Sequence, residues 1–186
     1  MSTDTFTPQD EHFMRLAMEQ AKLAEQQGEV PVGAVLVKEG KVIATGWNQS
    51  IGQHDATAHA EIQVLRQAGQ QLGNYRLLDT TLYVTLEPCP MCAGALLHSR
   101  VKRIVFGAPD LKAGAAGTVL NLFEHQAAYH YADVEHGLLE AECREQLQAF
   151  FRRRRKEKKA AKQALKNDDA SESMELAGEF LSKHLK

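Results

Sequence analysis

The sequence predicts an α/β fold in which a mixed β-sheet is covered by helices on both faces. The first observation is a pair of β-rich runs at residues 32–37 and 42–48, separated by a Lys-Glu-Gly-Lys segment that is typical of an antiparallel hairpin turn. The second is the alternation of helical and β patterns after this hairpin. Such alternation requires crossover connections, and these give parallel pairing of the later strands.

The first helix is indicated by Thr7 and Pro8, which suit the cap and the first position of a helix, and by apolar residues that recur at helical spacing. We expect it to end near Gly28. The hairpin follows and leaves Asn48 at the exit of its second strand.

The later elements are assigned by the same periodicity. Helices are predicted over residues 58–72, where Gly73 ends the pattern, and over 91–99. Strands are predicted over 81–86 and 104–107. From residue 138 a final helical stripe runs into a basic segment, and its members are Leu139, Cys143, Leu147, Phe150 and Phe151.

Length and composition indicate one domain, because 186 residues that are 44% hydrophobic suffice for one ordinary core. The charge is distributed unevenly: residues 1–151 have a net charge of -7, residues 152–166 of +8, and residues 167–186 of -3. We expect a folded domain over 1–155 and a charged extension over 156–186, partly helical and then disordered. The basic segment indicates a local contact with a polyanion.

The compartment is predicted from the cysteines and from the lack of apolar segments. The first ten residues do not resemble a secretory leader, and no apolar run approaches the length of a membrane helix. Three cysteines cannot all pair, and two of them lie three positions apart, which favours metal-bound thiolates in a reducing compartment. We expect a soluble cytoplasmic protein in which Cys143 is a small buried hydrophobe.

Two short motifs indicate a metal centre: His59-Ala60-Glu61 and, thirty residues after His59, Cys89-Pro-Met-Cys92. Cysteines at i and i+3 at a helix start face one ion, and the positive end of the helix favours their thiolates. His59 and Glu61, at i and i+2, reach one site only if His59 lies at a helix entrance. Three protein ligands leave one zinc position open, as in catalytic sites.

Glu61 is then a candidate for proton relay. Zinc lowers the pKa of a bound water towards neutrality. Hydrolytic removal of an amino group from a ring carbon also requires one proton for the ring nitrogen and one for the departing ammonia. A carboxylate beside the metal can deliver both protons. The combined H-x-E and P-C-x-x-C pattern resembles that of the zinc nucleobase deaminases.

Other interpretations stay open at this point. The two cysteines can form a redox pair, and a structural zinc can take His98 or Cys143 as its fourth ligand. The remaining histidines have no motif partner, so surface or structural roles are their default.

The resemblance extends well beyond the metal motif. The chain is similar to the bacterial tRNA-specific adenosine deaminases of the cytidine deaminase superfamily over about residues 8–155. The blocks that resemble this family in order and spacing are residues 29–37, 46–48, 57–62, 74–76, 82–89, 91–95, 98–100, 105–108 and 114–117.

This resemblance implies a cytidine-deaminase-like three-layer α/β/α fold with a mixed five-stranded sheet, a homodimer, and one zinc ion per subunit. The implied reaction is hydrolysis of adenosine to inosine at wobble position 34 of tRNA, in an arginine tRNA with an ACG anticodon. The implied partner is therefore the tRNA anticodon stem-loop. The implied roles are metal ligation by His59, Cys89 and Cys92, proton transfer by Glu61, and binding of the flipped base by Asn48 with Val32, Ala60 and Leu86 around it.

Asn48 suits base recognition because its amide offers a donor and an acceptor, although it can instead cap a turn. In similar enzymes the loop of Asp110 and Lys112 contacts nucleotides that flank the target. Asp110 would accept from a ribose 2′-hydroxyl, or else it stabilises a Pro-Asp turn.

The end of the domain offers two further candidates. Phe150 stacks on a flanking base or packs in the helix core. The four arginines at 152–155 contact the RNA backbone or form a solvated helix end, and the concentration of charge favours RNA.

Two other functions compete with tRNA editing. The same zinc chemistry serves deaminases of a free base or nucleoside, such as guanine, cytosine or cytidine. A zinc-stabilised RNA-binding module without turnover would retain the fold and the basic segment, although Glu61 and the open zinc position argue against it.

Overall fold

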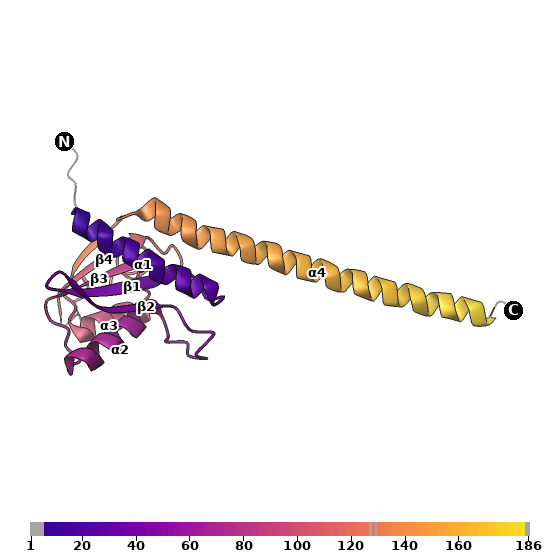
Figure 1. The fold of residues 1–186 in the computed structure, drawn as a ribbon, viewed down its shortest axis with the longest axis horizontal. Helices are drawn as coiled ribbons and strands as arrows, with labels where there is room; N and C mark the ends of the chain where they lie inside the picture. Colours follow the sequence, from indigo (N-terminus) through magenta and orange to yellow (C-terminus); the bar gives the residue numbers. More distant parts are fainter. Residues whose placement is uncertain (1–5, 127, 129, 185–186) are drawn as a thin grey trace. The chain divides into compact units, whose positions relative to one another are not determined.

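In the computed structural model, residues 1–147 form a unit built around a five-stranded mixed sheet with the strand order β2-β1-β3-β4-β5. Strands β1 to β4 are labelled in Figure 1. The structure describes residues 6–126, 128 and 130–184, with side chains up to residue 164. The strands are β1 (Gly33–Lys38), β2 (Lys41–Trp47), β3 (Thr80–Leu86), β4 (Arg103–Ala108) and β5 (Asp133–His136). The β1/β2 and β1/β3 pairs are antiparallel, whereas the β3/β4 and β4/β5 pairs are parallel. The predicted hairpin and the predicted mixed sheet are both confirmed.

Helices cover both faces of this sheet, as Figure 1 shows. Helix α1 (Pro8–Gln26) packs on one face, and α2 (Ala60–Leu72) and α3 (Pro90–Ser99) pack on the other. Strand β1 alternates between the two cores: Ala34 and Leu36 join the α2/α3 cluster, while Val35 and Val37 join the α1 cluster. The sheet is therefore buried on both sides, and the predicted three-layer architecture is confirmed.

The face covered by α1 also receives the start of α4 (Glu140–His184). Cys143 is 3% exposed and belongs to this core, as predicted for a small buried hydrophobe. It fits because Gly107 has no side chain, since a Cβ at that position would lie 2.5 Å from the Cys143 sulfur.

A buried polar network joins α1 to the sheet on this face. The carboxylate of Asp10 accepts hydrogen bonds from the Tyr83 hydroxyl (2.6 Å) and from Arg103, and Arg103 also pairs with Glu135 on β5. Burial alone would raise the pKa of Asp10, but the hydrogen bonds from Arg103 and Tyr83 hold it well below its usual range. Asp10 also completes the capping box of Thr7, which confirms the predicted start of α1.

The edge strand β5 was not located by the sequence pattern, although the resemblance implied a fifth strand. Its residues, Asp-Val-Glu-His, have no fully buried member and lack a clear alternation of apolar and polar side chains. Its position depends on pairing with β4 and on the ion pair between Glu135 and Arg103.

The chain divides into two compact units, residues 1–147 and 148–186. The second unit is the greater part of α4, which is helical to His184, whereas composition predicts a loss of structure beyond about residue 167. The expected domain boundary at 155 stays a prediction. Of the helices in the described part of the chain, none combines the length and the apolar character needed to cross a membrane.

Candidate metal centre and adjoining pocket

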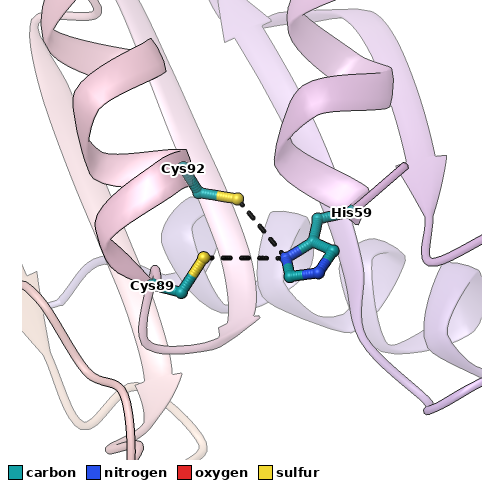
Figure 2. Close-up of side chains that lie close together, drawn as sticks. All are labelled: His59, Cys89 and Cys92. Carbon is teal, nitrogen blue, oxygen red and sulfur yellow. Dashed lines mark hydrogen bonds between the residues drawn. The ribbon is translucent and has the colours of Figure 1, made fainter. Parts of the chain in front are cut away.

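His59, Cys89 and Cys92 converge on one point between α2 and α3, as Figure 2 shows. The Nδ1 atom of His59 lies 3.7 Å from the sulfur of Cys89 and 3.6 Å from that of Cys92. All three potential ligand atoms lie within 4.8 Å of one another. Tetrahedral zinc with ordinary bond lengths would hold a nitrogen and a sulfur ligand about 3.6 Å apart. The chemical types of the three side chains and the distances between their ligand atoms therefore fit a zinc ion.

The geometry arises because two of these residues occupy helix N-cap positions. His59 precedes α2 with extended backbone angles (φ -77°, ψ 156°), and Cys89 precedes α3 in the same way (φ -74°, ψ 170°). Neither side chain caps its own helix, so each is free to turn towards the other. The predicted placement of His59 at a helix entrance is confirmed, and it explains how residues at i and i+2 face one site.

The alternatives that require a fourth protein ligand do not fit this geometry. Cys143 lies in the core under α1, on the opposite face of the sheet. His98 lines a separate groove between α2 and α3. Among the described residues, the group of possible ligands at this point contains three members, and the cysteines are not in a disulfide. Three ligands leave a position for a water molecule.

The electrostatics of the cluster favour cation binding. A hydrogen bond with Cys92 lowers the pKa of Cys89 to about 4, although partial burial opposes this shift. The same hydrogen bond and burial raise the pKa of Cys92. A hydrogen bond to Cys89 raises the pKa of His59, against the effect of its burial. The lowered pKa favours the thiolate form of Cys89, and a bound cation would favour deprotonation of Cys92 as well.

Glu61 lies in the first turn of α2 and is 3% exposed. Burial raises the pKa of its carboxyl to about 7, with a further increase from the negative charge of Cys89 and an opposing effect of a backbone hydrogen bond. A carboxyl group that titrates near neutrality can both accept and release a proton, as a relay requires.

A cavity of about 210 Å³ adjoins the cluster. His59, Glu61 and Cys89 form its reactive side. Of the side chains assigned to substrate binding, those that line it are Val32, Asn48, Leu86 and Asp110.

Asn48 follows β2 directly, and its Oδ1 accepts a hydrogen bond of 2.9 Å from the backbone N–H of Ala60. The acceptor of the amide is therefore engaged at the start of α2, which leaves its Nδ2 donor for the pocket. Ala60 is fully buried, and it contributes this backbone N–H instead of a pocket surface.

The remaining candidates from the sequence lie outside the cavity or at its rim. The carboxylate of Asp110 accepts backbone hydrogen bonds from Lys112 (2.9 Å) and Ala113 (3.3 Å), so it stabilises a turn while lining the cavity. The side chain of Lys112 is exposed. Both interpretations of Asp110 are compatible with this geometry.

The aromatic and basic candidates belong to α4. The ring of Phe150 lies 5.4 Å from that of Phe151 and 5.5 Å from the guanidinium carbon of Arg153. The side chains of Arg152, Arg153, Arg154 and Arg155 are exposed. All of these residues belong to the compact unit of residues 148–186.

Two buried glutamates were not singled out from the sequence. Glu29 is 3% exposed and accepts a hydrogen bond from the N–H of Gly52 (2.7 Å), and Glu87 is 2% exposed and accepts several from the loop of Asp110. Each lies in a block that resembles the deaminase family. Their hydrogen-bond partners are distant in sequence, so the local spacing of residues does not predict these contacts.

Comparison with known proteins agrees with this geometry. Residues 7–108 match the family model of the cytidine and deoxycytidylate deaminase zinc-binding region. A tRNA-specific adenosine deaminase of Haemophilus influenzae is 54% identical over 159 residues, which covers 85% of this chain and 92% of that protein.

Two solved structures extend the comparison. One, from a study of A-to-I editing by tRNA:A34 deaminases, is 47% identical with a TM-score of 0.71, and the match covers 73% of this chain and 98% of that chain. The other, a guanine deaminase of Bacillus subtilis, is 41% identical with a TM-score of 0.53, and the match covers 58% of this chain and 69% of that chain.

Proposed function

The chain belongs to the cytidine and deoxycytidylate deaminase family, among relatives that are tRNA-specific adenosine deaminases, and from this premise we propose that it converts adenosine 34 of tRNA to inosine. One observation supports this most directly: three zinc-type ligand atoms and a buried carboxyl group meet at a cavity that an asparagine amide also lines. This combination suits the hydrolytic deamination of a base bound in the cavity.

We assign metal binding and proton transfer to different residues. His59, Cys89 and Cys92 would hold one zinc ion, which when bound supplies an acidic site for activation of water. Glu61 would take one proton from the attacking water and deliver it to the ring nitrogen as the C–O bond forms. It would then take the second proton from the new hydroxyl group and deliver it to the amino group, which leaves as ammonia when the C–N bond breaks. Its burial beside Cys92 supports this role, because a shielded carboxyl group near pKa 7 can shuttle protons without exchange with bulk solvent.

Recognition of adenine is assigned to the amide of Asn48. Its Nδ2 group donates a hydrogen bond, and the acceptors on the edge of adenine include N7. Val32 and Leu86 supply apolar surface for the ring. The small volume of the cavity, about 210 Å³, favours a single extruded base over a larger ligand.

Contact with the RNA backbone is assigned to the basic part of α4. At 100° per residue, Arg152, Arg155, Lys159 and Lys162 fall on one face of the helix and extend over about 15 Å. All four are exposed. Arg153 and Arg154 point elsewhere and pair with Glu157. A row of cations on one face suits a row of phosphates.

Three finer assignments complete the proposal. The substrate is an arginine tRNA with an ACG anticodon, bound through its anticodon stem-loop in the cytoplasm. The enzyme is a homodimer, and a groove of about 640 Å³ between α2 and α3, flanked by the exposed Leu72 and Tyr75, supports a covering surface there. Light scattering of the purified protein measures the dimer, and a monomeric mass would exclude it.

A second candidate is deamination of a free purine, which the similarity to a guanine deaminase favours. The deciding experiment compares inosine formation in a stem-loop RNA containing A34 with ammonia release from free adenosine, cytidine and guanine. We expect turnover of the RNA alone, with the Glu61→Ala protein as a control for contaminating activity. Turnover of a free compound without turnover of the RNA would contradict the tRNA assignment.

A further inference from the structure

Glu87 is a buried anion whose hydrogen bonds hold one short loop. It follows β3 directly and precedes the metal motif, and its side chain is 2% exposed. Its Oε1 accepts backbone hydrogen bonds from Ala116 (2.9 Å) and Thr118 (3.1 Å), and its Oε2 accepts one from Asp110 (3.0 Å). A buried carboxylate is costly unless hydrogen bonds satisfy it, and here three backbone donors do so.

Backbone hydrogen bonds reinforce this connection on both sides of the carboxylate. The N–H of Glu87 donates to the carbonyl of Ala108 (2.9 Å), and the N–H of Ala115 donates to the carbonyl of Pro88 (2.9 Å). Residues 87–88 are thus hydrogen-bonded to both ends and to the middle of the loop 108–118. Cys89, a proposed metal ligand, is the next residue in the chain.

The fit around the carboxylate is close enough to restrict the sequence of the loop. A Cβ at Gly114 would lie 2.3 Å from Oε2 of Glu87 and 2.6 Å from the carbonyl oxygen of Asp110. Glycine at 114 therefore lets the loop close over Glu87. The loop and the carboxylate form one packed unit, and Asp110 lines the pocket from it.

We propose that Glu87 is a positioning residue for substrate: it fixes the loop 108–118, and with it Asp110, at the rim of the pocket, and so determines affinity for the polynucleotide. This proposal rests on the proposed function for the identity of the substrate. Glu87 also lines the cavity, but both of its carboxylate oxygens accept hydrogen bonds from the loop, so we assign it to holding the loop and not to the chemical step. The chemical step depends on Glu61 and the metal ligands, whereas binding depends on the position of the loop.

The principal test is Glu87→Gln. Glutamine keeps the size of the side chain but replaces one acceptor oxygen by a donor, so at least one loop N–H loses its partner. We expect KM for the A34 stem-loop to rise about tenfold while kcat changes by less than about threefold, because uniform binding and not the chemical step is affected. Zinc content should stay the same. Hydrogen exchange of the amides of Asp110, Ala116 and Thr118 should become faster.

Gly114→Ala displaces the same loop while leaving Glu87 intact, so it tests the proposal even if the first variant folds poorly. It should raise KM in the same way. Asp10→Asn is the matched control, since it also neutralises a buried carboxylate, but one that belongs to α1 on the other face of the sheet. We expect it to lower the thermal midpoint without changing KM.

The outcomes separate the two proposals. An unchanged KM and unchanged exchange in Glu87→Gln would overturn the positioning role, as would loss of zinc or a fall in kcat at constant KM. A rise in KM of the same size in Asp10→Asn would also overturn it, because the effect would then be general destabilisation. Wild-type protein that produces no inosine would contradict the proposed function, and the exchange measurement would still decide the role of Glu87.

Discussion

The N–H of Ala60 donates a hydrogen bond of 2.9 Å to Oδ1 of Asn48, so a side chain from the end of β2 caps the helix that His59 leaves uncapped. The oxygen of this amide therefore stabilises the start of α2, and we propose that its nitrogen recognises the base, since Asn48 also lines the cavity. The two functions can be separated by mutation.

Asn48→Asp keeps an acceptor for Ala60 and removes the donor, whereas Asn48→Ala removes both. We expect the aspartate variant to retain its thermal midpoint, and the alanine variant to lose about 1 kcal/mol of stability, the usual effect of a missing helix cap. Both should raise KM for the stem-loop RNA. Calorimetry and steady-state kinetics measure the two effects, and an aspartate variant with normal KM would remove Asn48 from base recognition.

Glu61→Ala should retain zinc and lose turnover by a factor of about 10² to 10⁴, the usual contribution of a general acid–base group. Metal analysis and single-turnover assays on the stem-loop measure both quantities. Glu135→Gln, on the edge strand β5, serves as a remote carboxylate control. Zinc lost together with activity would identify Glu61 as a ligand instead.

Removal of the metal should expose a difference between the cysteines. After chelation, Cys89 should react with iodoacetamide at neutral pH far faster than Cys143, because hydrogen bonding lowers the pKa of Cys89 to about 4 and burial raises that of Cys143 to about 12. Zinc added before alkylation should protect Cys89 and restore activity. Peptide mass spectrometry measures the labelling, and equal labelling with and without zinc would exclude Cys89 as a ligand.

Asp110→Asn should change the preference between RNA and DNA. Asparagine still accepts from the N–H groups of Lys112 and Ala113, so the turn survives, but the acceptor for a ribose 2′-hydroxyl is weaker. We expect the ratio of DNA to RNA turnover to rise by roughly tenfold, the value of one hydrogen bond to a charged group. Matched stem-loops in the two chemistries measure this ratio. An unchanged ratio would mean that Asp110 only stabilises the turn and does not distinguish RNA from DNA.

The basic face of α4 can be tested with two variants of equal charge. Glutamine at Arg155 and Lys159 should reduce the slope of log K against log salt by about 1.4 to 1.8, if each contacts one phosphate. Glutamine at Arg153 and Arg154 removes the same charge from the other faces and should have a much smaller effect. Equal slopes in the two variants would show that α4 contributes to RNA binding through its net charge and not through one face.

The convergence of His59, Cys89 and Cys92 could be predicted from the sequence because the spacing within each motif is local. His59 and Glu61 at i and i+2, and the cysteines at i and i+3, constrain where each helix begins, and the structure has the helix starts at those positions. The mixed sheet was predictable for a similar reason, since short segments of periodic hydrophobicity indicate its hairpin and the helices and strands that alternate after it.

Other features depend on contacts between distant residues. Strand β5 has four residues and no fully buried side chain, so its pattern resembles a loop until it pairs with β4. Glu87 is one acidic residue beside a proline, and its hydrogen bonds form only when the loop 108–118 folds over it. The hydrogen bond from the N–H of Ala60 to the amide oxygen of Asn48 likewise depends on how β2 and α2 pack together.

The placement of the metal ligands has a consequence for how such an enzyme can diversify. His59, Glu61, Cys89 and Cys92 stand at the starts of two helices that pack on the sheet, whereas Asp110 stands on a loop held by one carboxylate. Exchanges of exposed side chains in that loop, with Gly114 and the hydrogen bonds of Glu87 kept, can therefore alter which polymer is accepted while the residues at the helix starts stay in place. Laboratory evolution of new substrates should accumulate its changes around residues 108–118 first, and only later at the helix starts.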